Sequence, residues 1–144
     1  MKETSNHKKF KEVLLMYSQS TEYTPAIKEW KLIYTTEKES NCICGHHIVK
    51  NCVFQNKYNN SIITIGSTCV KKFFGLDYSD QFDIKNLMKK YSLKLLQYCL
   101  EEKIINQFEY DFLDNLPKFR KYSDKQRVLF FKVHEKICLE IEFV

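Results

Sequence analysis

Three cysteines and two histidines lie close together in the sequence and could bind a metal ion. They occur in two short segments, Cys42-Ile43-Cys44-Gly45-His46-His47 and Gly66-Ser67-Thr68-Cys69. Thiolates and imidazoles are the ligands that Zn²⁺ takes in tetrahedral protein sites. Gly45 directly follows the second cysteine, where a tight turn would need a positive φ. The two segments therefore predict one structural zinc ion.

The firmest predicted ligands are the thiols of Cys42, Cys44 and Cys69. Cys69 is expected to begin a short helix, whose backbone N–H groups and dipole would stabilise its thiolate. We predict His46, next to the turn glycine, as the fourth ligand, with Cys52 and His47 as alternatives. Four protein ligands would leave no open coordination position, which argues against metal catalysis.

The elements around these residues are predicted from the spacing of apolar side chains. Strands are expected over 31–36, 48–55 and 61–65, a turn over 56–60, and a short helix over 69–74 that ends at Gly75. A knuckle, a hairpin and then a helix is the order of a treble-clef-like zinc finger. The pattern differs from the usual one, because the knuckle is C-x-C rather than C-x2-C and the helix supplies one ligand instead of two. An amphipathic helix is expected before them, over 5–18.

The second half of the chain has the periodicity of helices. Apolar residues from Ile84 to Cys99 predict one long helical face, and a shorter helix is expected over 104–112. Ser123 and Gln126 form a capping box that opens a last helix, and we interpret Cys99 and Cys138 as packing residues. The fold class is α+β, a small antiparallel sheet with a zinc module followed by a helical half. We expect a single domain over 1–144, with the module at about 25–76 and the helical region at about 79–144.

Composition narrows the possible functions. The net charge is +5, and Arg120 and Arg127 are the only arginines among 23 cationic residues. A lysine-rich surface gives diffuse attraction to phosphate. With three glycines the chain has no Gly-rich phosphate loop, and no small-molecule substrate is evident. The beginning of the sequence has no signal-peptide pattern, no apolar run suits a membrane span, and six cysteines favour a reducing compartment. An intracellular, cytoplasmic location is expected.

The motif residues also resemble a known group of proteins. The resemblance rests on Glu29-Trp30, C-x-C-G-H from Cys42, Ile48, Cys52, Asn56 and Gly66-Ser67-x-Cys69-Val70-Lys71-Lys72-Phe73, and more loosely on 122–126. These residues look like those of small, mostly uncharacterised zinc-binding proteins of phages and large DNA viruses. The resemblance covers about residues 25–76 well. It implies a metal site and a viral or mobile-element origin, in which case the location would be the host cytoplasm, and it implies no established activity.

We consider three functions. The first is a non-enzymatic zinc module that binds DNA or RNA as an accessory of replication or transcription, because basic residues near aromatics can hold phosphates and stack bases. Its candidate contact residues are Lys50, Lys57, Tyr58, Lys71, Lys72, Arg120, Lys121 and Arg127. The second is a protein-interaction adaptor or subunit with a purely structural zinc, for which Phe130-Phe131 would be an exposed anchor. The third and remotest is an HNH-like nuclease, for which the helix lacks the second metal-binding His.

Overall fold

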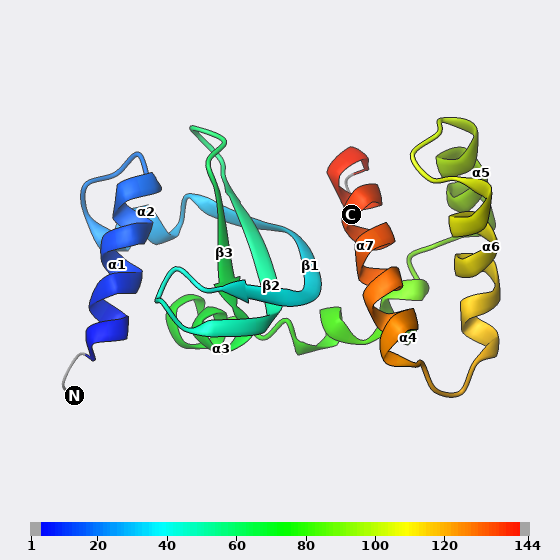
Figure 1. Ribbon diagram of the computed structural model, residues 1–144. Coiled ribbons are helices and arrows are strands. Elements are labelled where there is room, and N and C mark those ends of the chain that lie inside the picture. Colours follow the sequence, from blue (N-terminus) through cyan, green and yellow to red (C-terminus); the bar gives the residue numbers. More distant parts are fainter. Residues whose placement is uncertain (1–3, 142–144) are drawn as a thin grey trace. The chain divides into compact units, whose positions relative to one another are not determined.

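The chain divides into two compact units, Met1–Tyr78 and Ser79–Val144. The computed structural model describes residues 4–141 (Figure 1). The α+β class, the small antiparallel sheet and the helical second half are confirmed. The boundary falls where the sequence predicted the helical region to begin, whereas the single domain expected from chain length stays a prediction. Among the described residues, no helix combines the length and apolar character that crossing a bilayer requires.

A three-stranded antiparallel sheet forms the centre of the first unit. Its strands are β1 (Trp30–Asn41), β2 (His47–Asn56) and β3 (Ile62–Gly66), in the order β1-β2-β3. In the central strand β2, the consecutive residues Cys52, Val53 and Phe54 are all buried, so both faces of the sheet are covered there. All three predicted strands are confirmed, and β1 runs five residues beyond its predicted end at 36 because its polar end pairs with the start of β2.

Helices precede and follow this sheet in the sequence. They are α1 (Ser5–Tyr17), α2 (Tyr23–Ile27) and α3 (Ser67–Cys69), and α3 continues as a π-helical turn over Val70–Phe74. Gly75, at φ 69°, ends that turn as predicted. The ring of Phe10 in α1 is fully buried and stacks on Phe73 with a centroid separation of 4.0 Å. This contact fixes α1 to the turn that follows Cys69.

A buried carboxylate explains two of the residues that carry the resemblance. Glu29 accepts hydrogen bonds from the backbone N–H groups of Gln19 (2.7 Å) and Ser20 (2.9 Å) and from Nδ2 of Asn56 (2.9 Å). Burial raises the pKa of Glu29, but these hydrogen bonds outweigh it and hold the pKa below its usual value. Asn56 in turn accepts the N–H of Tyr58. Glu29 and Asn56 therefore support the β2–β3 turn and the entry to β1.

The second unit is a small helical bundle. Its helices are α4 (Ile84–Met88), α5 (Leu93–Glu101), α6 (Gln107–Asn115) and α7 (Asp124–Glu140), with 3₁₀ turns at Ser79–Phe82 and Leu116–Lys118. The predicted capping box of Ser123 and Gln126 opens α7. Apolar side chains from all four helices form one core.

Three expectations for the second unit are wrong. The long helical face over 84–99 is broken, because Ser92 accepts the N–H of Leu95 as the N-cap of a new helix. The next helix begins at 107 instead of 104, at a capping box of Asn106 and Glu109. The proposed exposed anchor Phe130-Phe131 is fully buried in the core.

The core of the second unit encloses an imidazole. His134 is 4% exposed, its ring stacks on Phe130 at 5.5 Å, and its Nδ1 shares a hydrogen bond with the Tyr91 hydroxyl. Nε2 lies 3.5 Å from Sγ of Cys138. Burial, and to a smaller degree the charge of Lys90, lowers the pKa of His134 to about 4. The neutral form is therefore the one that the fold accommodates.

We expect the second unit to lose stability in mild acid because of His134. The unfolded chain takes up this proton near pH 6.5 and the folded chain only near pH 4, so the stabilisation is complete above pH 6.5 and declines as the pH falls toward 4. At pH 5 the loss should be about 2 kcal/mol. Hydrogen exchange of α7 amides at pH 7 and pH 5, corrected for intrinsic rates, measures it. A His134→Gln variant, which does not ionise, should lose this part of the pH dependence, and an unchanged dependence would contradict the assignment.

Candidate metal centre

A tight backbone knuckle positions the first two cysteines. The N–H of Cys42 donates to the carbonyl of His46, and the N–H of Gly45 donates to the carbonyl of Cys42, both at 2.9 Å. Gly45 has φ 99°, which L-residues with a side chain rarely adopt. The N–H of Ile43 donates to the carbonyl of Thr64 in β3, so the knuckle is tied to the strand that leads to the third cysteine.

Gly66 allows Cys69, the third cysteine, to come close to the knuckle. A Cβ at this position would lie 2.9 Å from Cγ2 of Ile48 in β2, which is closer than real contacts. Gly66 is also the N-cap of α3, and Cys69 is the third residue of that helix. The glycine therefore lets β3 turn into α3 directly beside the start of β2 and directs Cys69 toward the knuckle.

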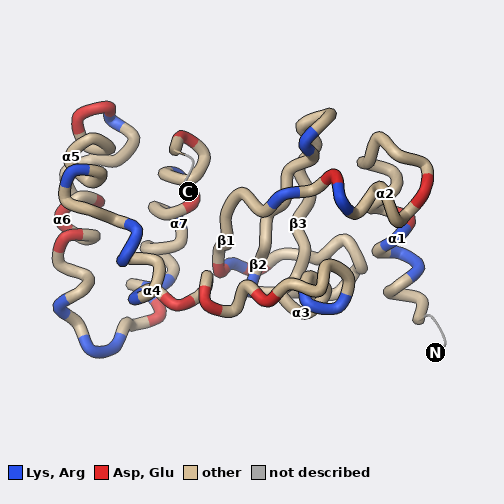
Figure 2. Tube along the Cα trace, turned by 180° about the vertical axis from the view of Figure 1, so that it is seen from behind, with Lys and Arg blue, Asp and Glu red and all other residues tan. Residues whose placement is uncertain are grey.

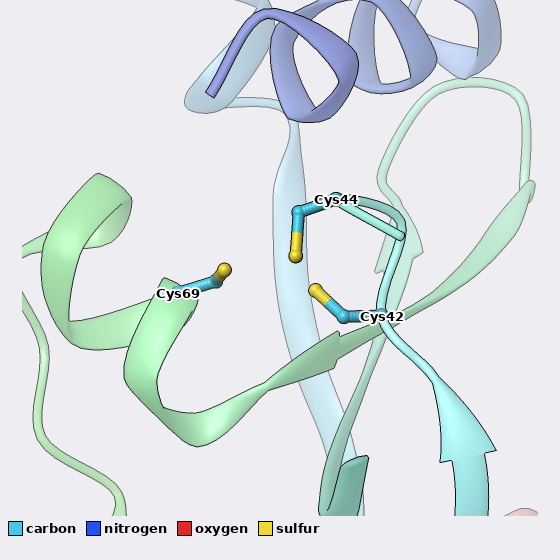
Figure 3. Close-up of side chains that lie close together, drawn as sticks. All are labelled: Cys42, Cys44 and Cys69. Atoms are coloured by element: carbon cyan, nitrogen blue, oxygen red, sulfur yellow. The ribbon is translucent and has the colours of Figure 1, made fainter. Parts of the chain in front are cut away.

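The three thiols point toward one another (Figure 3). The Sγ atoms of Cys42, Cys44 and Cys69 all lie within 4.8 Å of one another, and among residues 4–141 no other three His, Cys, Asp or Glu side chains form such a group. Zn–S bonds of about 2.3 Å in a tetrahedron place sulfurs about 3.8 Å apart. The donor set and its spacing therefore fit a thiophilic metal ion such as Zn²⁺.

Electrostatics at the cluster favour a thiolate on Cys42. The thiol of Cys69 donates to it, and although burial opposes ionisation, the backbone N–H groups of Cys44 and Gly66 add further donors, which hold the pKa of Cys42 below its usual value. The same hydrogen bond raises the pKa of Cys69, because its proton is held between the two sulfurs. A shared proton of this kind is what a metal ion displaces when it binds.

The other predicted ligands lie outside this group. Cys52 is fully buried in β2. Its burial, and to a smaller degree the nearby charge of Cys42, raises its pKa to about 12. It is therefore a protonated core residue. His46, the predicted fourth ligand, and His47 are exposed at the end of the knuckle.

A pocket of about 720 Å³ opens over the thiols. Besides the three cysteines, it is lined by the imidazoles of His46, His47 and His7 and by the side chains of Lys50 and Lys72. His7 comes from α1 and is not among the ligands predicted from the sequence. A single histidine in an amphipathic helix has no metal-ligand spacing, so its place beside the cluster is visible only in the folded chain.

Comparison of the chain with known protein families, with curated proteins and with solved structures finds no match. The resemblance to viral and phage zinc proteins accordingly stays a prediction. The geometry of the cluster shows a chain that can bind a metal ion through three cysteines.

The predicted nucleic-acid contacts do not form one surface in the first unit. Lys50 and Lys72 lie at the pocket, and the neighbouring Lys71 lies 4.0 Å from the carboxylate of Asp77. Lys57 and Tyr58 lie at the β2–β3 turn, where Tyr58 is 69% exposed. The remaining candidates, Arg120, Lys121 and Arg127, belong to the second unit, and Figure 2 shows the charges along the chain. Arg127 donates to the carbonyl of Phe82 at 3.4 Å.

Proposed function

We propose that this protein is a non-enzymatic zinc-binding factor that binds nucleic acid, as an accessory of a viral, phage or mobile-element replication or transcription machinery. The convergence of three thiols from two separate segments carries the proposal. Zn²⁺ at this position would cross-link the knuckle to α3. Its fourth ligand would be an imidazole of the pocket, for which His46 is the prediction from sequence. With four protein ligands the ion has a structural role and no catalytic one.

The pocket supports nucleic acid as the partner. Lys50 and Lys72 stand at it together with three imidazoles, and no carboxylate is among its described lining residues. One Zn²⁺ with three thiolates carries a net negative charge, which lysines next to it balance. Lysines in excess of those that balance this charge would attract the phosphate backbone of a nucleic acid. The lysines of α1 and of the turn after α3 are visible in Figure 2.

A salt titration tests this proposal. We expect zinc-loaded protein to bind labelled single-stranded DNA or RNA with an affinity that falls steeply with salt concentration. The double variant Lys50→Gln/Lys72→Gln should reduce the slope of log K against log salt by about 1.4, since each phosphate contact contributes about 0.7 on single strands. Lys94→Gln, an exposed lysine of α5 that is not among the candidate contacts, is the matched control. Absence of binding, or a slope that the double variant leaves unchanged, would contradict the proposal.

An adaptor role is favoured by a different observation. In the second unit an apolar pocket of about 340 Å³ is lined by Phe108, Phe112, Phe119 and Leu129 of α6, α7 and their connection. Phe108 is 67% exposed and Phe119 43% exposed. Aromatic side chains at a surface can anchor a protein partner. Binding through them would depend weakly on salt, which distinguishes this function from phosphate binding.

A further inference from the structure

We propose that His7 of α1, and not His46 of the knuckle, is the fourth protein ligand of the metal centre. The inference rests on the proposed zinc site and identifies the ligand that completes it. A tetrahedral zinc site with three thiolates needs one further donor. Three imidazoles line the pocket in which the thiols lie, so the choice among them depends on how each ring is held.

Contacts with the helical turn of Cys69 hold the His7 ring. Its edge packs on Phe73 at a centroid distance of 5.2 Å and an interplanar angle of 89°. Its Nε2 lies 3.1 Å from Nζ of Lys72. Phe73 and Lys72 follow Cys69 by one turn, so the ring lies against the same turn that carries a metal ligand. His7 is half-buried, whereas His46 and His47 are exposed.

The rest of α1 keeps His7 at this place. Thr4 caps the helix by accepting the N–H of His7, and Phe10, one turn later, is buried against Phe73. On the knuckle side, the side chain of Lys9 reaches within 3.2 Å of the position that a Cβ of Gly45 would occupy. The first turns of α1 thus contact both the knuckle and the turn after α3, the two segments that supply the thiols.

Completion of the site requires a movement of the His7 side chain. The nitrogens of His7 lie outside the 4.8 Å group of sulfurs, so the ring has to turn toward them when the metal binds. The cation beside Nε2 is the ammonium of Lys72, which is exposed and can swing into solvent. When the metal ion binds, its positive charge replaces that of the Lys72 ammonium at the imidazole nitrogen. Zinc then connects α1 to the sheet, the knuckle and α3.

The test uses the full-length chain loaded with Co²⁺ or Zn²⁺. His7→Phe keeps an aromatic ring against Phe73 and removes the nitrogen donor. We expect it to change the ligand-field bands of the Co²⁺ protein and to weaken zinc binding by more than the 10–100-fold that an outer-sphere partner typically costs. His46→Phe and His47→Phe are the matched controls and should retain the wild-type bands and affinity.

A second readout is the protection of α1. Removal of zinc by a chelator should increase hydrogen exchange of α1 amides in the wild type and have little further effect in His7→Phe. Wild-type bands and affinity in His7→Phe, or a loss found in His46→Phe instead, would overturn the assignment of His7 while leaving the zinc site intact. If the wild-type chain itself binds no Zn²⁺ or Co²⁺, the proposed zinc function fails, which is a different result.

Discussion

Cys69→Ser should abolish stoichiometric zinc binding and disorder the knuckle and hairpin of the first unit. The variant leaves two thiols from one knuckle, and nothing then links α3 to that knuckle through the metal. Structural zinc contributes on the order of 10 kcal/mol to small metal-stabilised folds. That is comparable to the whole stability of a domain of this size. Elemental analysis gives the metal content, and the fluorescence of Trp30, which is buried in the first unit, follows unfolding.

Cys138→Ser is the matched control for this variant. Cys138 is a half-buried residue of α7 whose sulfur contacts His134, and it belongs to no group of metal ligands among the described residues. We expect full zinc content and a loss of stability of about 1 kcal/mol, as is typical of single substitutions. The ligand assignment would be contradicted if the two variants lost the same amount of zinc and Trp30 fluorescence showed the same degree of unfolding in both.

The elements that the sequence predicted well are those with a strong local signal. Gly75 ends its turn in the left-handed conformation, and Ser123 caps α7 through its own side chain. Each signal depends on a few neighbouring residues and is independent of the tertiary fold. The thiols of Cys42 and Cys44 were predicted for the same reason, because a knuckle with Gly45 at its turn requires no long-range information. Cys69 was predicted from its expected place at the start of a short helix.

The incorrect predictions arise where the spacing of apolar residues is compatible with more than one structure. Apolar residues from Ile84 to Cys99 keep a helical spacing through Ser92, yet the N-cap hydrogen bond of Ser92 is more favourable than a continuous helix there. Phe130 and Phe131 are adjacent, and a single helix can bury both only if other helices cover two sides of it. Such coverage depends on how α7 packs among its neighbours, which the local sequence does not encode.

The proposed fourth ligand, His7, could not be predicted from the sequence for a physical reason of the same kind. His46 is near the cysteines along the chain, but its side chain is exposed. His7 is far from them along the chain and reaches their pocket because Phe10 and Phe73 pack together. Proximity in sequence predicts ligands within one knuckle, and packing decides those from other elements.

Phe131→Ala should unfold the second unit or bring it close to unfolding. The side chain is fully buried, with ring contacts to Phe130 at 5.2 Å and to Phe82 at 6.4 Å. Truncation of a buried Phe costs about 3–5 kcal/mol through lost transfer free energy and the cavity left behind. A small helical unit has a total stability of only a few kcal/mol. Hydrogen exchange of α7 amides and helical circular dichroism measure the loss.

Phe108→Ala separates the two roles that aromatic residues play in this unit. Phe108 is two-thirds exposed in α6 and lies at the apolar pocket, so its truncation should change stability by less than about 0.5 kcal/mol. If the second unit is an adaptor, the same variant should weaken binding of a protein partner while α7 stays protected. A large loss of stability in Phe108→Ala would show that this ring is a packing residue. The apolar pocket at Phe108 replaces the buried Phe130-Phe131 as the candidate anchor, and that result would contradict its proposed role in binding a partner.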